Sequence, residues 1–259
     1  MKKQLLNVDG LEKYSDYEWL EISIGCSDTN VYKLTKGNES VFLKVGKSGL
    51  LTNEYLNLKK LKRYLNVPNI IFYYNKDMEI LITTAMDGKM SCEDEFIDIF
   101  PNETIDILCN AIKTIQSIIV DKELLECFKV YNLEEEIKKI RNKISSGEIN
   151  SIPNKPVFSK FSNLNEILLY LENNKPKGDL YLSHGDVSMP NVFINENKLS
   201  GFIDIGNAGI RQKWYDIADL YVSIRRNFES QEVADEFLKK LDIEDKEPLE
   251  YYEILINLS

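Results

Sequence analysis

Two aspartates and an asparagine are spaced in this sequence so that they could serve a single reaction. Asp186 ends the tripeptide His184-Gly185-Asp186, which contains the only histidine of the chain. Asn191 comes five residues later, and Asp204 lies in the segment 203–206. Phosphotransferases use an aspartate, an asparagine and a second aspartate in this order to orient a hydroxyl and to hold metal ions against a nucleotide's phosphates. The pattern therefore predicts phosphoryl transfer.

A β-hairpin is expected to bring these side chains together. The segment 192–203 has apolar ends and a polar middle, and the open ends of a hairpin lie side by side. Converging oxygen ligands suit Mg²⁺, which also binds substrate phosphates. We expect Asp186 to accept the proton of the attacking hydroxyl, and Asn191 and Asp204 to hold Mg²⁺. Three solvated loop residues are the alternative, and the combined spacing argues against it.

Two neighbouring residues are expected to support this loop. His184 invites a general-base interpretation, but the spacing gives that role to Asp186, so we expect His184 to brace the loop through hydrogen bonds. Asp216 precedes the apolar-periodic segment 217–220 and is predicted to cap a helix N-terminus. A buried aspartate at this position could also brace the backbone of the loop.

Lys44 is the candidate for binding phosphates. It lies in the alternating strand 41–45, and a lysine that points inward needs an anionic partner. Glu54, at the start of a predicted helix, can supply that charge, as the strand lysine and helix glutamate do in kinases. An exposed strand lysine is the alternative. The segment 25–30 between two strands could cover phosphates with its N–H groups or could be only a turn.

Two types of periodicity divide the chain. Residues 1–85 are mainly strands around one helix at 53–65, whereas residues 86–259 are mainly helical. The sequence therefore predicts an α+β, two-lobed fold with an antiparallel-sheet N-lobe and a helical C-lobe. The helices expected in the second part are 103–119, 133–144, 166–172, 216–228, 231–241 and 249–258.

Composition excludes several classes of protein. A net charge of −10 at pH 7 argues against a nucleic-acid partner. No apolar run approaches the ~20 residues that cross a bilayer, and the apolar run after the basic start is too short for the hydrophobic region of a signal peptide. The four cysteines show no zinc spacing. We expect a cytoplasmic protein, without a membrane partner, that is a monomer or a weak dimer.

The motifs together resemble the aminoglycoside phosphotransferase family, whose fold is protein-kinase-like, and most of all the aminoglycoside 3′-phosphotransferases of Gram-positive bacteria. The resemblance covers nearly the whole chain. It rests on Val31-Tyr32-Lys33-Leu34, Phe42-Leu43-Lys44, Ser183-His184-Gly185-Asp186, Ser200-Gly201-Phe202-Ile203-Asp204 and Lys213-Trp214-Tyr215-Asp216-Ile217-Ala218.

This resemblance implies a role for each matching residue. Asp186 would be the catalytic base, Asn191 and Asp204 the magnesium ligands, and Lys44 with Glu54 the pair that binds the phosphates of ATP or GTP. Ser27 would lie in the loop that covers the phosphates, and Phe42 would stack on the base. Residues 83–86, Thr84 and Met86 among them, would form the hinge that contacts the edge of the base.

The acceptor side departs from the family. Such relatives hold a cationic antibiotic with carboxylates in a helical-lobe loop and at the C-terminus, but here residues 255–259 contain no acid. The loop 147–161 carries only Glu148, and Asn207 replaces an expected basic residue. We therefore expect weak or altered aminoglycoside binding. The alternatives are another cationic or hydroxylated acceptor, such as choline, homoserine, a sugar or another antibiotic, and a nucleotide-binding regulator without catalysis.

Overall fold

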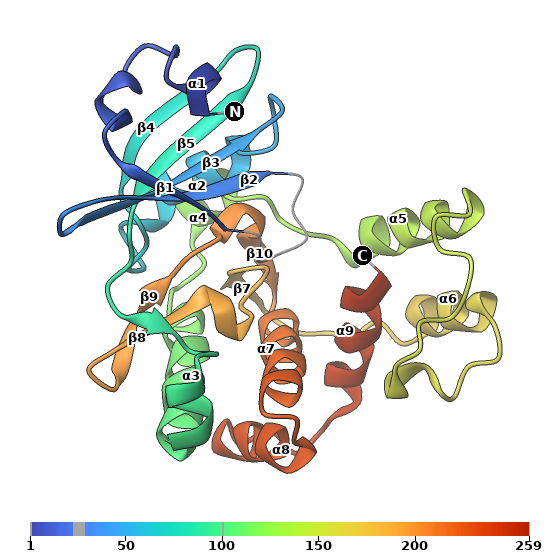
Figure 1. The fold of residues 1–259 in the computed structure, drawn as a ribbon. Helices are drawn as coiled ribbons and strands as arrows, with labels where there is room; N and C mark the ends of the chain where they lie inside the picture. The colour runs from blue at the N-terminus through green and yellow to red at the C-terminus, as the bar shows by residue number, and fades with distance from the viewer. Residues whose placement is uncertain (1, 23–28, 100, 259) are drawn as a thin grey trace. The chain divides into compact units, whose positions relative to one another are not determined.

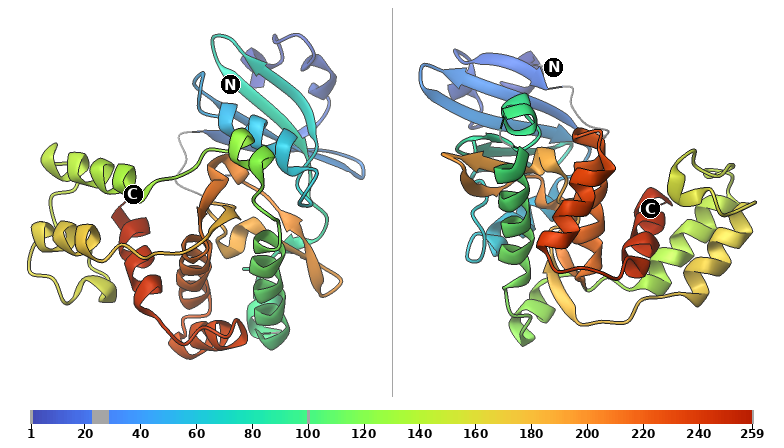
Figure 2. Two further views of the ribbon diagram at one scale, coloured as in Figure 1. Left: turned by 180° about the vertical axis from the view of Figure 1, so that it is seen from behind. Right: turned by 90° about the horizontal axis from the view of Figure 1, so that it is seen from below.

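The computed structural model describes residues 2–22, 29–99 and 101–258. The chain forms two compact units, Met1–Met86 and Asp87–Ser259, most of whose helices and strands are labelled in Figure 1 and seen from two further sides in Figure 2. The first unit is built on an antiparallel sheet and the second is mainly helical, which confirms the predicted α+β class.

The first unit contains a five-stranded sheet with the order β1-β2-β3-β5-β4. All of its neighbouring strands are antiparallel. Its elements are α1 (Lys2–Leu5), a short 3₁₀ turn (Glu12–Tyr14), β1 (Glu18–Ile22), β2 (Asn30–Lys36), β3 (Glu39–Gly46), α2 (Thr52–Leu61), β4 (Ile70–Asn75) and β5 (Glu79–Thr84).

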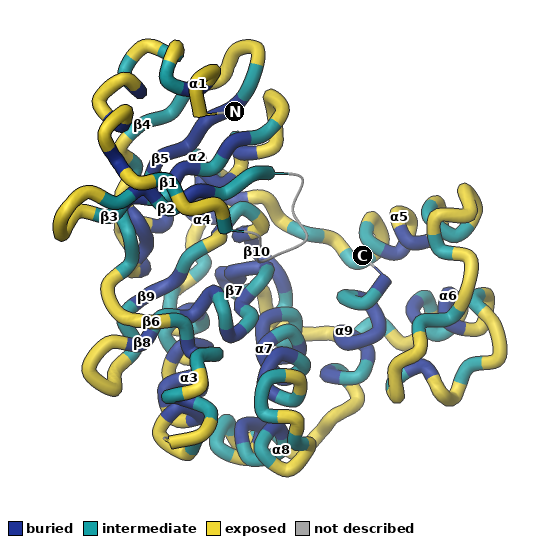
Figure 3. The backbone as a smooth tube through the Cα atoms, viewed as in Figure 1, coloured by how far each residue is buried: buried dark blue, intermediate teal, exposed yellow. Residues whose placement is uncertain are grey.

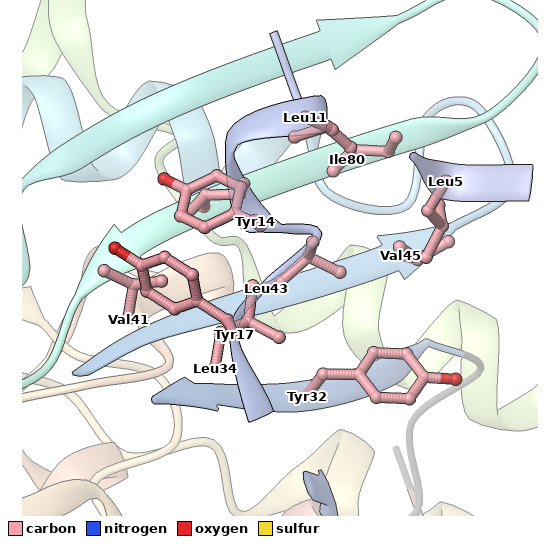
Figure 4. Close-up of a cluster of buried hydrophobic side chains, with 11 residues drawn as sticks. Leu5, Leu11, Tyr14, Tyr17, Tyr32, Leu34, Val41, Leu43, Val45 and Ile80 are labelled. Atoms are coloured by element: carbon pink, nitrogen blue, oxygen red, sulfur yellow. The ribbon is translucent and has the colours of Figure 1, made fainter. Parts of the chain in front are cut away.

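Alternation along β3 separates the core of this unit from its polar face. Val41, Leu43 and Val45 are buried, whereas Phe42 and Lys44 belong to the opposite face. The buried side chains join a cluster that includes residues from α1 and the 3₁₀ turn, so the N-terminal segment covers one face of the sheet (Figure 4). Lys44 therefore points away from the apolar core.

The second unit packs helices around two small sheets. One sheet pairs β7 with β10, and the other has the order β6-β8-β9. The buried stripes of α3 and α7 face the interior of this unit (Figure 3). Its elements are β6 (Lys89–Met90), a π-helical turn (Glu95–Ile99), α3 (Pro101–Gln116), α4 (Lys122–Cys127), α5 (Leu133–Ser145), a 3₁₀ turn (Pro156–Phe158), α6 (Leu164–Asn173), β7 (Leu180–Ser183), a 3₁₀ turn (Met189–Asn191), β8 (Val192–Asn195), β9 (Lys198–Phe202), a 3₁₀ turn (Ile205–Asn207), β10 (Gly209–Gln212), α7 (Trp214–Asn227), α8 (Gln231–Lys240) and α9 (Glu247–Leu258).

Helix boundaries differ from the predicted ones by a few residues. Helix α3 begins at Pro101, two residues before the predicted start at Glu103, because proline is favoured in the first turn of a helix. Helix α2 ends at Leu61, before the predicted end at Leu65, and α4 and β10 were not expected. None of the helices in the described ranges is long and apolar enough to span a membrane.

Candidate active site

The loop that carries Asp186 is held from behind by a buried aspartate of α7. Asp216 is 2% exposed, and its carboxylate accepts hydrogen bonds from the Ser183 hydroxyl at 2.7 Å and from the His184 and Gly185 N–H groups at 2.8 and 3.1 Å. The predicted bracing role is confirmed. The predicted N-cap role is wrong, because α7 begins earlier and Lys213 occupies its N-cap.

The hydrogen bonds of His184 define its tautomer. The ring is buried, its Nδ1 accepts the Asp186 N–H at 3.3 Å, and its Nε2 lies 3.0 Å from the Ile203 carbonyl oxygen. A backbone N–H needs an acceptor and a carbonyl needs a donor, so the imidazole carries its proton on Nε2. His184 thus links the loop to the end of the hairpin, as predicted, and has no nitrogen free to act as a base.

Gly185 allows the loop to lie against the segment after β9. Its φ is +80°, and an added Cβ would stand 2.2 Å from the carbonyl oxygen of Asn207. No side chain fits there, and the backbone conformation itself favours glycine. The residue type before Asp186 is therefore fixed by close packing of two backbone segments.

Asp186 is set up to take a proton. It is half-buried, and burial raises the pKa of its carboxyl, as does the negative charge of the nearby Asp204, while hydrogen bonds from Ser188 and Asn191 oppose the rise. A carboxylate whose pKa lies above the usual aspartate range is a better proton acceptor.

The β8-β9 hairpin brings Asn191 and Asp204 together. Strand β8 begins at Val192, paired with Phe202, and the Ile203 N–H donates to the Asn191 carbonyl at 3.0 Å. The Asn191 amide nitrogen donates to the Asp186 carbonyl oxygen at 2.9 Å. The predicted convergence of the three residues is therefore present, and it depends on backbone hydrogen bonds.

The donor set suits a hard cation that arrives with phosphates. Asp204 is exposed and adopts a left-handed conformation, with φ 57° and ψ 51°. No described residue donates a hydrogen bond to the Asn191 amide oxygen. Among the residues that the structure describes, no three His, Cys, Asp or Glu side chains form a metal-binding group. Mg²⁺ typically takes only one or two protein carboxylates together with phosphates and waters, so Asn191 and Asp204 fit it.

The first unit holds the other predicted pair. The Lys44 ammonium contacts both carboxylate oxygens of Glu54, at 2.8 and 2.9 Å, and Glu54 is buried whereas Lys44 is partly exposed. The predicted ion pair is thus confirmed. Because one side of Lys44 remains open to solvent, its charge can reach a further anion.

Glu79 fixes the first turn of α2, the helix that carries Glu54. The sequence analysis did not single out Glu79. Glu79 is fully buried at the start of β5. Its carboxylate accepts the Leu51 N–H at 2.7 Å and the Thr52 hydroxyl at 2.6 Å, as well as the Tyr73 hydroxyl. These bonds tie the first turn of α2 to the sheet. A glutamate at the start of an apolar strand was the available signal.

The predicted base-binding residues lie on the polar face of β3, at the end of β5 and just after it. Phe42 is half-buried and pairs with Thr83 across the strands. The Thr84 hydroxyl accepts the Asn69 N–H at 3.0 Å, and the Met86 sulfur lies 3.8 Å from the Asn66 amide nitrogen. Ser27 lies outside the described residues. Contact of these residues with a nucleotide base stays a prediction.

Comparison with known proteins supports the resemblance found in the motifs. Residues 156–252 match the Phosphotransferase enzyme family. An aminoglycoside 3′-phosphotransferase of Enterococcus faecalis is 27% identical, and the match covers 100% of both chains. Among solved structures, an aminoglycoside-3′-phosphotransferase of type VIII superposes with a TM-score of 0.76 at 19% identity, covering 96% of each chain. The aminoglycoside phosphotransferase APH(3'')-Id of Streptomyces rimosus, solved with ADP and streptomycin, has a TM-score of 0.74 at 18% identity, covering 99% of this chain and 97% of that one.

Proposed function

We propose that this protein, which resembles the aminoglycoside phosphotransferases over its full length, transfers the γ-phosphate of ATP or GTP to a hydroxyl of an aminoglycoside. The observation that carries the proposal is the loop in which Asp186, Asn191 and Asp204 converge, braced by Asp216 and His184. A phosphotransferase with an alcohol acceptor needs this combination of a base and metal ligands. We expect the reaction in the cytoplasm, where these nucleotides are made.

Each unit contributes a separate part of the chemistry. In the first unit, Lys44 held by Glu54 neutralises phosphate charge, and Phe42, Thr84 and Met86 are the proposed contacts of the base. In the second unit, Asp186 orients the acceptor hydroxyl and takes its proton as the oxygen attacks the γ-phosphorus. Asn191 and Asp204 would hold Mg²⁺, which when bound offsets the negative charge that develops on the phosphate oxygens.

The raised pKa of Asp186 suits this role. Burial opposes ionisation of the carboxyl, and the Asp204 charge adds to that effect, so the proton is accepted more readily than by an exposed aspartate. A cation on Asn191 and Asp204 would lower the repulsion between the two carboxylates, which keeps Asp186 ionised before the transfer step.

Contacts in the loop 147–161 and near the end of α9 favour a changed acceptor range. Glu148, the only acid of the loop, already lies 3.7 Å from the Lys143 ammonium, and Asn257 near the end of α9 contacts Lys155. A polycationic ligand gains about 1.5–3 kcal/mol from each charge-assisted hydrogen bond. The second candidate is therefore a kinase for a smaller hydroxylated acceptor.

Replacement of Asp186 tests the reaction. Asp186→Asn should reduce kcat for phosphorylation of kanamycin by a factor of about 10²–10⁴, because general-base catalysis is lost, while the Kd for Mg·ATP changes little. Coupled detection of ADP gives the rate and calorimetry gives the Kd. Asp179→Asn, an exposed aspartate just before β7, is the control and should retain full activity. Undiminished turnover in Asp186→Asn would contradict the proposal.

A panel of acceptors separates the two candidates. Aminoglycosides, other antibiotics, amino alcohols and sugars are each offered with Mg·ATP and with Mg·GTP to the wild-type protein. Robust phosphorylation of kanamycin supports the first candidate, whereas activity confined to small acceptors supports the second. ATP binding without transfer to any acceptor would favour a regulator instead.

A further inference from the structure

The two chain segments that lead to the proposed base and to the second metal ligand lie side by side. Strands β7 and β10 are antiparallel, and the pair nearest the site is Ser183 with Gly209 (Figure 1). The same register, continued beyond this pair, sets Gly185 opposite Asn207. The Gly185 N–H donates to Asp216 and not to the opposite segment. The contact between Gly185 and Asn207 thus lies outside the ladder and needs a support of its own.

The carbonyl group of Asn207 is the point at which the two segments touch. An added Cβ at Gly185 would stand 2.2 Å from this carbonyl oxygen. Asn207 is also the last residue of the 3₁₀ turn Ile205–Asn207, whose N-cap is Asp204. The direction of one carbonyl group therefore links the turn that starts at Asp204 to the residue before Asp186.

Arg211 of β10 and Tyr131 hold this carbonyl. A terminal nitrogen of Arg211 donates to the Asn207 oxygen at 2.8 Å, and the Tyr131 hydroxyl donates to the same oxygen at 3.3 Å. The Arg211 nitrogen would also lie 2.8 Å from a Cβ added at Gly185, so the guanidinium stands at the contact itself. A carbonyl oxygen has two lone pairs, and two donors that converge on it restrict its direction.

The Arg211 side chain is itself held in place by its surroundings. It is 5% exposed, and its guanidinium lies 3.3 Å from the ring centre of Tyr131 and 4.4 Å from that of Tyr215. The segment 129–131 is joined to β10 by backbone hydrogen bonds on both sides of Ile210, at 2.8 and 2.9 Å. Both donors to the carbonyl therefore come from neighbouring, hydrogen-bonded parts of the backbone.

A buried arginine is a costly way to bind one carbonyl. The guanidinium stays charged in proteins, and its Nε has no hydrogen-bond partner among the described residues. Glu136 of α5 faces this charge, since burial raises the pKa of the Glu136 carboxyl and the charge of Arg211 opposes that rise. Apolar side chains of similar volume often stabilise a protein as well as a buried pair of charges does. The arrangement therefore favours a role for Arg211 beyond stability.

We propose that Arg211 is a positioning residue for phosphoryl transfer. Its bond to the Asn207 carbonyl holds the turn that begins at Asp204 against the loop that carries Asp186, and so sets the distance between the two carboxylates. Arg211 acts through these backbone segments and not by contact with a substrate. The proposal rests on the proposed function, because a transfer step that uses both carboxylates is sensitive to their spacing.

Replacement of Arg211 by methionine removes the charge and the donor but keeps most of the side-chain length. Arg211→Met should lose about 10²-fold in kcat for kanamycin, the loss expected from a displacement of about 1 Å at a reacting group. The Kd for Mg·ATP should change little, because the proposed phosphate contacts of Lys44 belong to the first unit. Arg211→Lys restores a charge and a donor without the planar face and should recover part of kcat. Full kcat in Arg211→Met would overturn the proposal.

Arg225 of α7 is the matched control for the loss of an arginine in the protein interior. Its guanidinium pairs with the buried carboxylate of Glu253 in α9 and lies 5.5 Å from the ring centre of Tyr221. Arg225→Met should be less stable than the wild type in urea denaturation, as Arg211→Met should be, but should keep its kcat. Equal losses of kcat in the two variants would show a general effect of stability and refute the positioning role.

A milder change keeps the proposal testable if Arg211→Met does not fold. Tyr131→Phe leaves the ring against Arg211 and removes only the second donor to the carbonyl, so kcat should fall about 2- to 10-fold, the worth of one hydrogen bond. Tyr251→Phe is its control, because the Tyr251 hydroxyl also donates to a backbone carbonyl, that of Leu171 at 3.0 Å. The same kcat in both tyrosine variants would contradict the proposal.

Hydrogen exchange separates failure of this proposal from failure of the proposed function, since it needs no substrate. In Arg211→Met the amides of 205–208 and of 184–187 should both exchange faster than in the wild type, and in Arg225→Met neither segment should change. Faster exchange in both segments, without phosphorylation of any acceptor by the wild type, removes the proposed function and keeps the link between the segments. Phosphorylation of kanamycin by the wild type, with unchanged exchange in Arg211→Met, removes the link and keeps the kinase.

Discussion

Asp219 is a carboxyl group that the protein buries behind the catalytic loop without fully satisfying it. Its Oδ2 is buried and has no hydrogen-bond partner among the described residues. Burial raises the pKa of Asp219 to about 7, the charges of Asp186 and Asp216 add to the rise, and a hydrogen bond from the Val187 N–H opposes it. The folded protein therefore holds a proton on Asp219 at pH values where an unfolded chain would release it.

Asp219→Asn should change how stability depends on pH. Because the pKa of Asp219 rises from 3.8 to about 7 on folding, ionisation costs the wild type stability as pH increases through this window. Relative to the Asn variant, the wild type should lose about 2–3 kcal/mol of unfolding free energy between pH 5 and pH 8. Urea denaturation of both proteins across this range measures the difference. A constant difference would show that Asp219 stays ionised throughout.

Residue roles that follow from spacing could be predicted, and those that follow from burial could not. Asp186, Asn191 and Asp204 lie at the ends of a hairpin whose turn is visible in the sequence, so their convergence was expected. Asp219 and Arg211 owe their properties to segments that are distant in sequence, such as Val187 and Tyr131. A sequence does not show how deeply a single charged side chain is covered.

At the scale of elements, helix α2 is placed by a buried side chain of β5 more than by its own sequence. Its N-cap residue, Leu51, makes no side-chain cap bond, but the Leu51 N–H and the Thr52 hydroxyl donate to Glu79. Burial raises the pKa of Glu79, yet these bonds and that of Tyr73 outweigh it and hold the pKa below the usual value. The Lys44–Glu54 pair therefore depends on the buried carboxylate that fixes the first turn of α2.

Element types were predicted better than element boundaries, and the reason is visible in α2 and α7. Apolar periodicity predicted both helices. The first residues of both helices are set by contacts outside them. The N-terminus of α2 is bound by Glu79. At α7, Asp216 does not cap the helix, because its carboxylate accepts hydrogen bonds from the loop that carries Asp186. Strand β10 was missed because its four residues carry no alternating pattern of their own, and it is held by pairing with β7 and by a bridge from Ile210 to Val130, both distant in sequence.

Two glycines with the same backbone strain offer a matched test of the loop. Gly185 has φ +80° and Gly147 has φ +78°, but an added Cβ meets the Asn207 carbonyl only at Gly185, and nothing lies within 4 Å at Gly147. Both alanine variants should lose about 1–2 kcal/mol from the left-handed conformation. Gly185→Ala should in addition displace Asp186 and reduce kcat by about 10²-fold or more, while Gly147→Ala keeps full activity.

Thermal unfolding and steady-state kinetics of the two variants separate strain from displacement. Equal losses of stability and equal activities in Gly147→Ala and Gly185→Ala would mean that the close approach of the two backbones has no catalytic consequence.

At the scale of the whole molecule, negative charge is the property available to attract a cationic acceptor. The chain carries a net charge of −10 at pH 7. The lysines of the loop 147–161 have partners, since Lys160 pairs with Glu250 and Lys155 contacts Asn257. With the charge of Lys160 paired, the net negative field of the molecule favours approach of a cation and opposes approach of the anionic nucleotide, whose binding we predict to depend on Lys44 and on a bound cation.

Ionic strength should therefore act differently on the two substrates. Salt screens exposed charges over ~10 Å at 0.1 M, so kcat/KM for kanamycin should fall about tenfold or more between 20 and 300 mM KCl, because steered association is lost. The KM for Mg·ATP, repelled by the net charge, should stay constant or decrease over the same range. A kcat/KM for kanamycin that does not change with salt would place acceptor selection entirely in local contacts and leave no role for the charge of the whole protein.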